Sequence, residues 1–230
     1  MHLANSLSAV QVAAQRDALG LIVTSWPIRR APLENQMLAM AVIGDAMRKP
    51  GASNVYSAMD RYERKRFGEP LDLFNAYSHL GAMVHCLNTT NYGRYDFGEH
   101  RMNPSPVADE IARVGGAPGK VPLLMRETAS AGLHAADDIL LWLDSEKLKG
   151  REIDVLRFSA EEVRYKAWLV YAVCERLRGK KVDPAAIRRQ TNRLKDLLIK
   201  TFTGFWTDWT IRDELRYRYS PDEEWVRQLG

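Results

Sequence analysis

The sequence has few cysteines and no hydrophobic run long enough to span a membrane. Cys86 and Cys174 are its two cysteines. They lie far apart between apolar residues, so neither a disulfide framework nor a cysteine-based metal cluster is expected. No stretch of about 18 apolar residues occurs, and the N-terminus lacks the basic-then-apolar pattern of a signal peptide. These absences favour a cytoplasmic protein, or one incorporated into a particle assembled inside the cell, with no membrane partner.

Motifs of known chemistry are missing as well. The sequence contains no zinc-finger pattern, no nucleophile elbow and no dinucleotide-binding fingerprint. Its glycine-rich run, residues 115–122, lacks the spacing of a phosphate-binding loop. We therefore expect no cofactor, and the sequence disfavours an enzyme. The glycine-rich run predicts a hinge instead.

What is present is the composition of an ordinary globular protein. The chain has 230 residues, of which 46% are hydrophobic and 27% charged, values that disfavour disorder. This length suits one substantial core better than two small ones. We expect a single helical domain over residues 1–230, with the hinge at 115–122 separating an N-terminal helical layer (1–114) from a C-terminal one (123–230).

Helical periodicity and capping residues predict an all-α, compact bundle of about eight helices with little or no strand. The expected helices cover about residues 6–19, 33–49, 54–67, 71–87, 107–114, 123–148, 159–178 and 184–202, with a final turn at 220–229. Two short apolar runs, 21–26 and 151–158, could each be a strand or a connector. Ser159 with Glu162, and Ser220 with Glu223, have the spacing of capping boxes that begin helices.

The strongest local pattern is a basic helical hairpin, residues 176–200. It has nine basic residues against Asp183 and Asp196, a net charge of +7, whereas the whole chain carries +4. Asp183 and Pro184 begin its second helix, and a stripe from Ile187 to Phe202 faces the core. The charge indicates either a solvated helix face or a surface for nucleic acid or another anionic partner. The candidate residues are Lys180, Lys181, Arg188, Arg189, Arg193 and Lys200.

Residues 88–106 form the longest stretch without periodicity. Aromatic residues spaced by glycines and flanked by arginines argue against disorder and suit a protein interface or a stacking platform for single strands. A loop folded onto its own domain and an active-site loop are the alternatives. The candidate contact residues are Tyr92, Arg94, Tyr95, Phe97 and Arg101.

A second aromatic cluster follows the basic hairpin. Phe205, Trp206 and Trp209 fall within five residues, and such a cluster either plugs the end of a helix bundle or anchors a partner. Downstream, Arg212, Arg216 and Arg218 lie close to tyrosines. The segment thus combines basic and aromatic side chains.

One group has the spacing of metal ligands. His134, Asp137 and Asp138 lie within one helical turn and could hold a divalent ion or do acid–base chemistry. No second half of such a site is recognisable, and a site in a helix bundle draws ligands from facing helices. The alternative is an exposed His–Asp pair.

Three functions follow from these patterns. The favoured one is a non-enzymatic structural protein that forms a homo-oligomer or larger assembly through the aromatic loop and the C-terminal basic-aromatic segment. A helical core with a long aromatic loop resembles viral head-to-tail adaptor proteins in layout, so a virion component is one form of this hypothesis. The alternatives are a helical nucleic-acid-binding protein that uses the basic hairpin and a metal-dependent enzyme.

Overall fold

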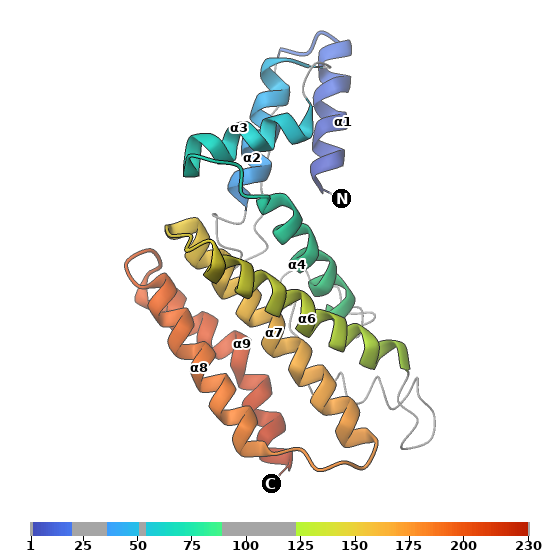
Figure 1. Ribbon diagram of the computed structural model, residues 1–230, viewed down its shortest axis with the longest axis vertical. Coiled ribbons are helices and arrows are strands. Elements are labelled where there is room, and N and C mark those ends of the chain that lie inside the picture. Colours follow the sequence, from blue (N-terminus) through green and yellow to red (C-terminus); the bar gives the residue numbers. More distant parts are fainter. Residues whose placement is uncertain (1, 20–35, 51–53, 89–122, 230) are drawn as a thin grey trace. The chain divides into compact units, whose positions relative to one another are not determined.

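The computed structural model describes residues 2–19, 36–50, 54–88 and 123–229 and confirms the all-α prediction (Figure 1). These residues form eight helices and no strand; an isolated bridge joins Thr203 to Trp206. The chain divides into two compact units, Met1–Tyr77 and Ser78–Gly230. The aromatic loop, the helix expected at 107–114 and the hinge at 115–122 lie outside the described residues, so these stay predictions.

The first unit contains three helices and the start of a fourth. Its helices are α1 (His2–Gln15), α2 (Met37–Arg48), α3 (Val55–Phe67) and α4 (Leu73–Asn88), and α4 continues past the boundary between the units. Consecutive helices pack together, α1 against α2 and α2 against α3. Val10 of α1 is buried with Ile43 and Ala46 of α2, and Leu7 packs against this cluster. The first predicted helix therefore buries its apolar side chains against α2.

A buried carboxylate joins α3 to the beginning of α4. Glu63 is 3% exposed and accepts three hydrogen bonds, from the backbone N–H groups of Leu71 at 2.6 Å, Asp72 at 3.0 Å and Leu73 at 2.9 Å. The first amides of a helix have no partner inside it, so a carboxylate there replaces the water they would lose on burial. Glu63 therefore fixes where α4 starts.

The methionines of α2 lie outside its buried face. Met37, Met40 and Met47 are 38%, 48% and 40% exposed. The residues of α2 that are buried are Leu38, Val42, Ile43 and Ala46. Leucine, valine and isoleucine on the neighbouring stripe thus take the inner face, and the more adaptable methionines lie outside it.

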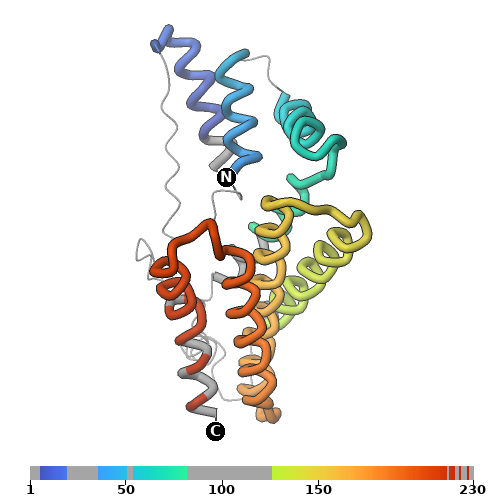
Figure 2. Tube along the Cα trace, turned by 90° about the vertical axis from the view of Figure 1, so that its left-hand side faces the viewer, coloured from blue at the N-terminus to red at the C-terminus, as the bar shows by residue number. Residues whose placement is uncertain are grey.

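The second unit consists of two helical hairpins (Figures 1 and 2). Its helices are α6 (Leu123–Ser145), α7 (Arg151–Leu177), α8 (Pro184–Phe202) and α9 (Asp208–Leu229). α6 packs against α7, α8 packs against α9, and α7 also packs against α8. The α6–α7 turn and the α8–α9 turn lie at one end of this unit, and the α7–α8 turn lies at the other (Figures 1 and 2).

α8 forms as its sequence predicts. The Asp183 carboxylate accepts a hydrogen bond from the Ala185 amide at 2.9 Å, with Pro184 as the first helical residue. Every residue of the predicted stripe is buried, namely Ile187, Thr191, Leu194, Leu198, Thr201 and Phe202. The buried residues form one continuous face, so the apolar periodicity and the cap at Asp183 indicate the same helix.

Two predicted helix starts are wrong. Residues 151–158 were expected to be a strand or connector, but they are the first two turns of α7, and Ser159 donates to the Val155 carbonyl at 2.9 Å inside the helix. Ser220 likewise lies inside α9, which begins at Asp208. Both Ser-x-x-Glu patterns occur in helix interiors, where the serine is not a cap.

Candidate functional site

The turn between α8 and α9 presents the aromatic cluster at one end of the second unit. Gly204 has a φ of 83°, a conformation that glycine adopts without strain, and it turns the chain. The amides of Phe205 and Trp206 both donate to the Phe202 carbonyl at 3.0 Å. Thr207 then caps α9 by accepting from the Thr210 amide at 3.1 Å. The turn is therefore held by hydrogen bonds on both sides.

Phe202 and Trp206 close the end of the hairpin. Phe202 is fully buried; it meets Phe158 of α7 edge to face, with ring centroids 5.2 Å apart, and stacks on Trp206 at 3.8 Å and 9°. Such pairs add to the free energy gained from burying their area. Trp206 is half-buried and packs on the core at this end of the hairpin through that stack.

Phe205 and Trp209 remain outside the core. They are 64% and 69% exposed, although both belong to a structured turn or helix. The Arg151 guanidinium lies 3.7 Å from the Phe205 ring centroid and 5.0 Å from that of Phe202, and it also donates to the Thr201 carbonyl. Arg151 thus orients the exposed ring from the facing helix through cation–π contact.

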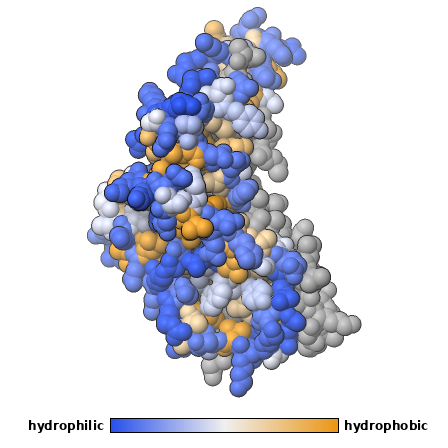
Figure 3. Space-filling view, in the orientation of Figure 1, coloured by the Kyte–Doolittle hydropathy of each residue, from blue (hydrophilic) through white to orange (hydrophobic). Residues whose placement is uncertain are grey.

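The exposed aromatic pair is a small feature on a polar surface. Leu141, at 70%, and Ile199, at 41%, are the other large hydrophobic residues of the second unit that are exposed among those described. The face of the molecule in Figure 3 is mainly hydrophilic, with hydrophobic side chains in separate small patches. An exposed large aromatic is the type of residue that anchors protein interfaces.

Ion pairs within the protein neutralise much of the basic hairpin. Arg178 and Lys180 pair with Glu175, Arg189 with Asp183, Arg193 with Glu161, and Lys195 with Glu223. Arg176, Lys181, Arg188 and Lys200 have no ion pair with a described residue. They are spread over both ends of the hairpin. Despite its net charge of +7, the basic hairpin therefore presents separate cations and not a continuous row that a partner could contact.

Two of these acidic partners, Glu161 and Glu175, lie on α7. Glu175, 8% exposed, is contacted by Arg126 of α6 at 3.4 Å and by Arg178 at 2.9 Å, besides Lys180. The hydrogen bond from Lys180, with further contributions from Lys180 and Arg178, lowers the pKa of Glu175 although burial opposes this. This carboxylate ties the ends of α6 and α7 to the start of the basic hairpin.

Arg218 forms ion pairs inside the protein, whereas the sequence analysis grouped it with a segment of basic and aromatic side chains. It donates to Glu162 of α7 at 2.6 and 2.5 Å and to Glu214 at 2.7 Å. Burial alone would lower its pKa, but the charges and hydrogen bonds of the two glutamates raise it above the ordinary value. The neighbouring Tyr219 is fully buried, whereas Arg212 and Arg216 are exposed.

The structure gives the metal hypothesis no support. His134, Asp137 and Asp138 are exposed on α6, and Asp137 pairs with Arg164 of α7 at 2.8 Å. Among the residues that the structure describes, no group of three or more His, Cys, Asp or Glu side chains is arranged to hold a metal ion. The aromatic-loop candidates Tyr92, Arg94, Tyr95, Phe97 and Arg101 are not among the described residues.

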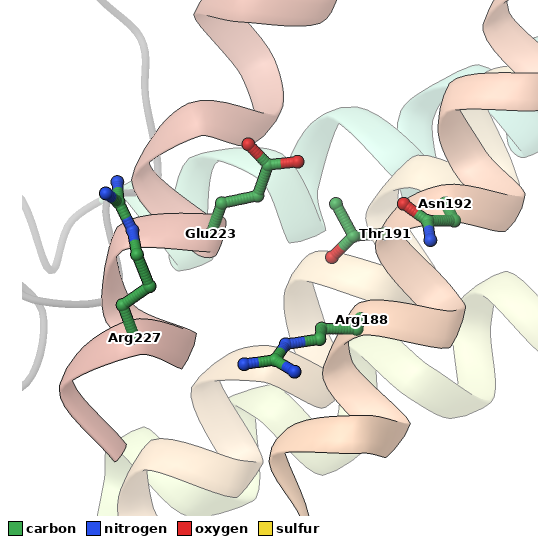
Figure 4. A pocket seen from close by; sticks show the side chains of 5 residues that line it. All are labelled: Arg188, Thr191, Asn192, Glu223 and Arg227. Atoms are coloured by element: carbon green, nitrogen blue, oxygen red, sulfur yellow. The ribbon is translucent and has the colours of Figure 1, made fainter. Parts of the chain in front are cut away.

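A groove between α8 and α9 was not predicted. It has a volume of about 350 Å³ and is lined by Arg188, Thr191 and Asn192 of α8 and by Glu223 and Arg227 of α9 (Figure 4). The sequence singled out Arg188 alone. Asn192 follows it by one helical turn, a spacing that would have indicated a shared face. The contribution of α9 depends on how the two helices pair, which periodicity does not specify.

Comparisons of the chain with protein-family models, with curated proteins and with solved structures give no significant match. The helices in the described part of the chain include none with the length and hydrophobicity needed to cross a bilayer.

Proposed function

We propose that this chain is a non-enzymatic assembly protein that binds a neighbouring protein subunit through Phe205 and Trp209. The observation that carries the proposal is that both side chains are largely exposed while the turn beneath them is rigidly held. Interfaces gain most of their binding energy from a few such aromatic anchors, and an anchor fixed before binding loses less entropy on docking.

The partner is a second copy of the chain or another subunit of a larger assembly. The proposal includes a position between the subunits of a viral particle. Only the resemblance in layout to viral head-to-tail adaptor proteins supports this form of it. The aromatic loop at 88–106 would add to the same contact or form a second one.

The test is the mass of the purified full chain by light scattering, at low and at high salt, with absorbance monitored for nucleic acid. We expect a salt-resistant oligomer, because apolar contacts are not weakened by screening as ion pairs are. Phe205→Ala together with Trp209→Ala should dissociate it to monomers. Tyr56→Ala is the matched control, since Tyr56 is 72% exposed and belongs to the other unit.

Two results would contradict the proposal. One is a wild-type chain that stays monomeric at micromolar concentration and binds no copy of itself or other purified subunit. The other is an oligomer that survives the double substitution. If the oligomer also persists after Tyr95→Ala with Phe97→Ala, the aromatic segments are not the interface at all.

A further inference from the structure

The exposed face that begins with Trp209 continues along α9 as a basic surface. Arg212 and Arg216 follow Trp209 at spacings of three and seven residues, so the three exposed side chains share one face of the helix. Neither arginine makes an ion pair with a described residue. Two carboxylates lie nearby on the same helix: Asp208 is exposed at its start, and Asp213 is half-buried and has a contact of its own. This face therefore joins an aromatic ring to two available guanidinium groups.

The outer face of α6 has the opposite charge. Asp137, Asp138, Leu141 and Asp144 recur at helical spacing, so they share one face, and all four are exposed. Leu141 is 70% exposed, which is unusual for a leucine in the second unit. After residue 126 the sequence of α6 contains no lysine or arginine. This helix therefore presents one apolar side chain among carboxylates.

The carboxylates on α6 differ in their availability. Asp137 pairs with Arg164 at 2.8 Å and Asp144 pairs with Arg157 at 2.6 Å, and both arginines belong to α7. Asp138 makes no ion pair with a described residue. It precedes Leu141 by one helical turn, about 4.5 Å along the helix axis. The outer face of α6 thus offers an apolar side chain and an available negative charge one turn apart.

We propose that the exposed face of α9 in one copy of the chain docks against the outer face of α6 in a second copy. This inference rests on the proposed assembly function and names the surface that receives the aromatic anchor. Trp209 lies over Leu141 in this contact. Arg212 follows Trp209 by one turn, and it reaches Asp138 when the two helices run antiparallel. Parallel helices would bring Arg212 to Asp144, whose charge is already paired.

The proposed contact joins two different surfaces and is therefore heterologous. α6 packs on α7 and α9 packs on α8, and Figure 2 shows red α9 and yellow-green α6 on opposite sides of the second unit. Each copy can thus bind one neighbour through α9 and another through α6, which builds a closed ring or an open chain of copies. The apolar side chains supply most of the affinity and the charges fix the register, so the oligomer still resists salt.

The test is an exchange of charge between two variants of the full chain, with mass measured by light scattering. Arg212→Glu and Asp138→Arg should each weaken self-association by at least about tenfold, because each brings like charges together. An equimolar mixture of the two variants should assemble as the wild type does, since every contact between unlike variants joins opposite charges. Recovery in the mixture supports the inference and identifies both surfaces at once.

Two matched controls reverse exposed charges outside the contact. Lys181→Glu lies at the α7–α8 turn, and Glu127→Arg lies on α6 about 16 Å before Asp138 along the helix. Both should assemble as the wild type does, and circular dichroism checks that every variant is folded. Leu141→Ala should weaken the contact. Leu141 is covered only while copies are in contact, so it stays accessible in a dilute, monomeric chain.

Other outcomes overturn the inference. One is a mixture that stays monomeric, and another is an Asp138→Arg chain that assembles as the wild type does. If Phe205→Ala with Trp209→Ala dissociates the oligomer but Asp138→Arg does not, the aromatic contact stands and its partner surface lies elsewhere. A wild-type chain that stays monomeric yet binds a different purified subunit through the aromatic turn overturns this inference alone. Failure here is thereby distinguishable from failure of the assembly proposal.

Discussion

Arg218 on α9 donates through Nη1 to both carboxylate oxygens of Glu162 on α7, at 2.6 and 2.5 Å. The two residues are 56 positions apart in the chain. The same guanidinium reaches Glu214, whose side chain is 2% exposed. An ion cluster of this kind joins helices that are distant in sequence, and removing its cation takes a shared guanidinium away from both carboxylates.

Arg218→Met is expected to lower the free energy of unfolding by about 3–5 kcal/mol, the usual cost of breaking a buried pair by removing one partner. Chemical denaturation followed by circular dichroism measures this. Arg212→Met is the control on the same helix, because Arg212 is exposed, and it should change stability by less than about 0.5 kcal/mol. Equal stability of the two variants would show that the cluster is not stabilising.

Glu63→Gln is expected to destabilise the start of α4. The carboxylate accepts from three backbone amides, whereas a glutamine offers one acceptor oxygen and a competing donor. The expected loss is about 1–3 kcal/mol. Faster hydrogen exchange at Leu71, Asp72 and Leu73 would localise it. Glu69→Gln, an exposed position nearby, should leave exchange at these amides unchanged.

Glu175 is expected to make the protein sensitive to acid. Its pKa is lowered in the folded state by Lys180 and Arg178, so its contribution is complete above the ordinary glutamate pKa of about 4.3 and is lost as pH falls through the lower folded-state pKa. The difference in melting temperature between wild type and Glu175→Gln should therefore shrink from about pH 6 to about pH 3. Glu146→Gln, an exposed control, should differ little from wild type throughout. A difference that stays constant over this range would contradict the prediction.

Cys174 is expected to be unreactive in the native state. Its side chain is fully buried, and burial raises the pKa of the thiol to about 11, so little of the nucleophilic thiolate forms near neutral pH. In a Cys86→Ser background, modification by a thiol reagent should proceed at the rate of unfolding. An exposed thiol placed by Leu141→Cys in a chain without native cysteines should react at once. Equally fast reaction of Cys174 would contradict its burial.

Local signals were sufficient to predict α8 but not α7. In α8 the cap, the first proline and the buried stripe coincide from Asp183 to Phe202. In α7 the short apolar run at 151–158 left a strand and a connector open, but Ile153, Val155, Leu156 and Phe158 are all buried in a helix. A helix buried on several sides has no polar face to reveal its period, so its beginning cannot be read from alternation alone.

The candidate sites were predictable only in part. Phe205, Trp206 and Trp209 were recognised as a cluster, yet only the fold separates half-buried Trp206 from its two exposed neighbours. The positive charge of the hairpin was evident from composition, whereas its neutralisation by Glu161, Glu175 and Glu223 depends on helix pairing. Ion pairs between elements far apart in sequence leave no local pattern.

The hairpin arrangement of the second unit also bears on how it folds. α6 with α7 and α8 with α9 each join neighbours in sequence through short turns, so each pair closes a small loop at low entropic cost and can form early. The contact between Glu162 and Arg218 must wait until both hairpins have met. Interactions made after the transition state slow unfolding without speeding folding. This ion pair therefore governs how long the native state persists once formed, rather than how quickly the chain reaches it.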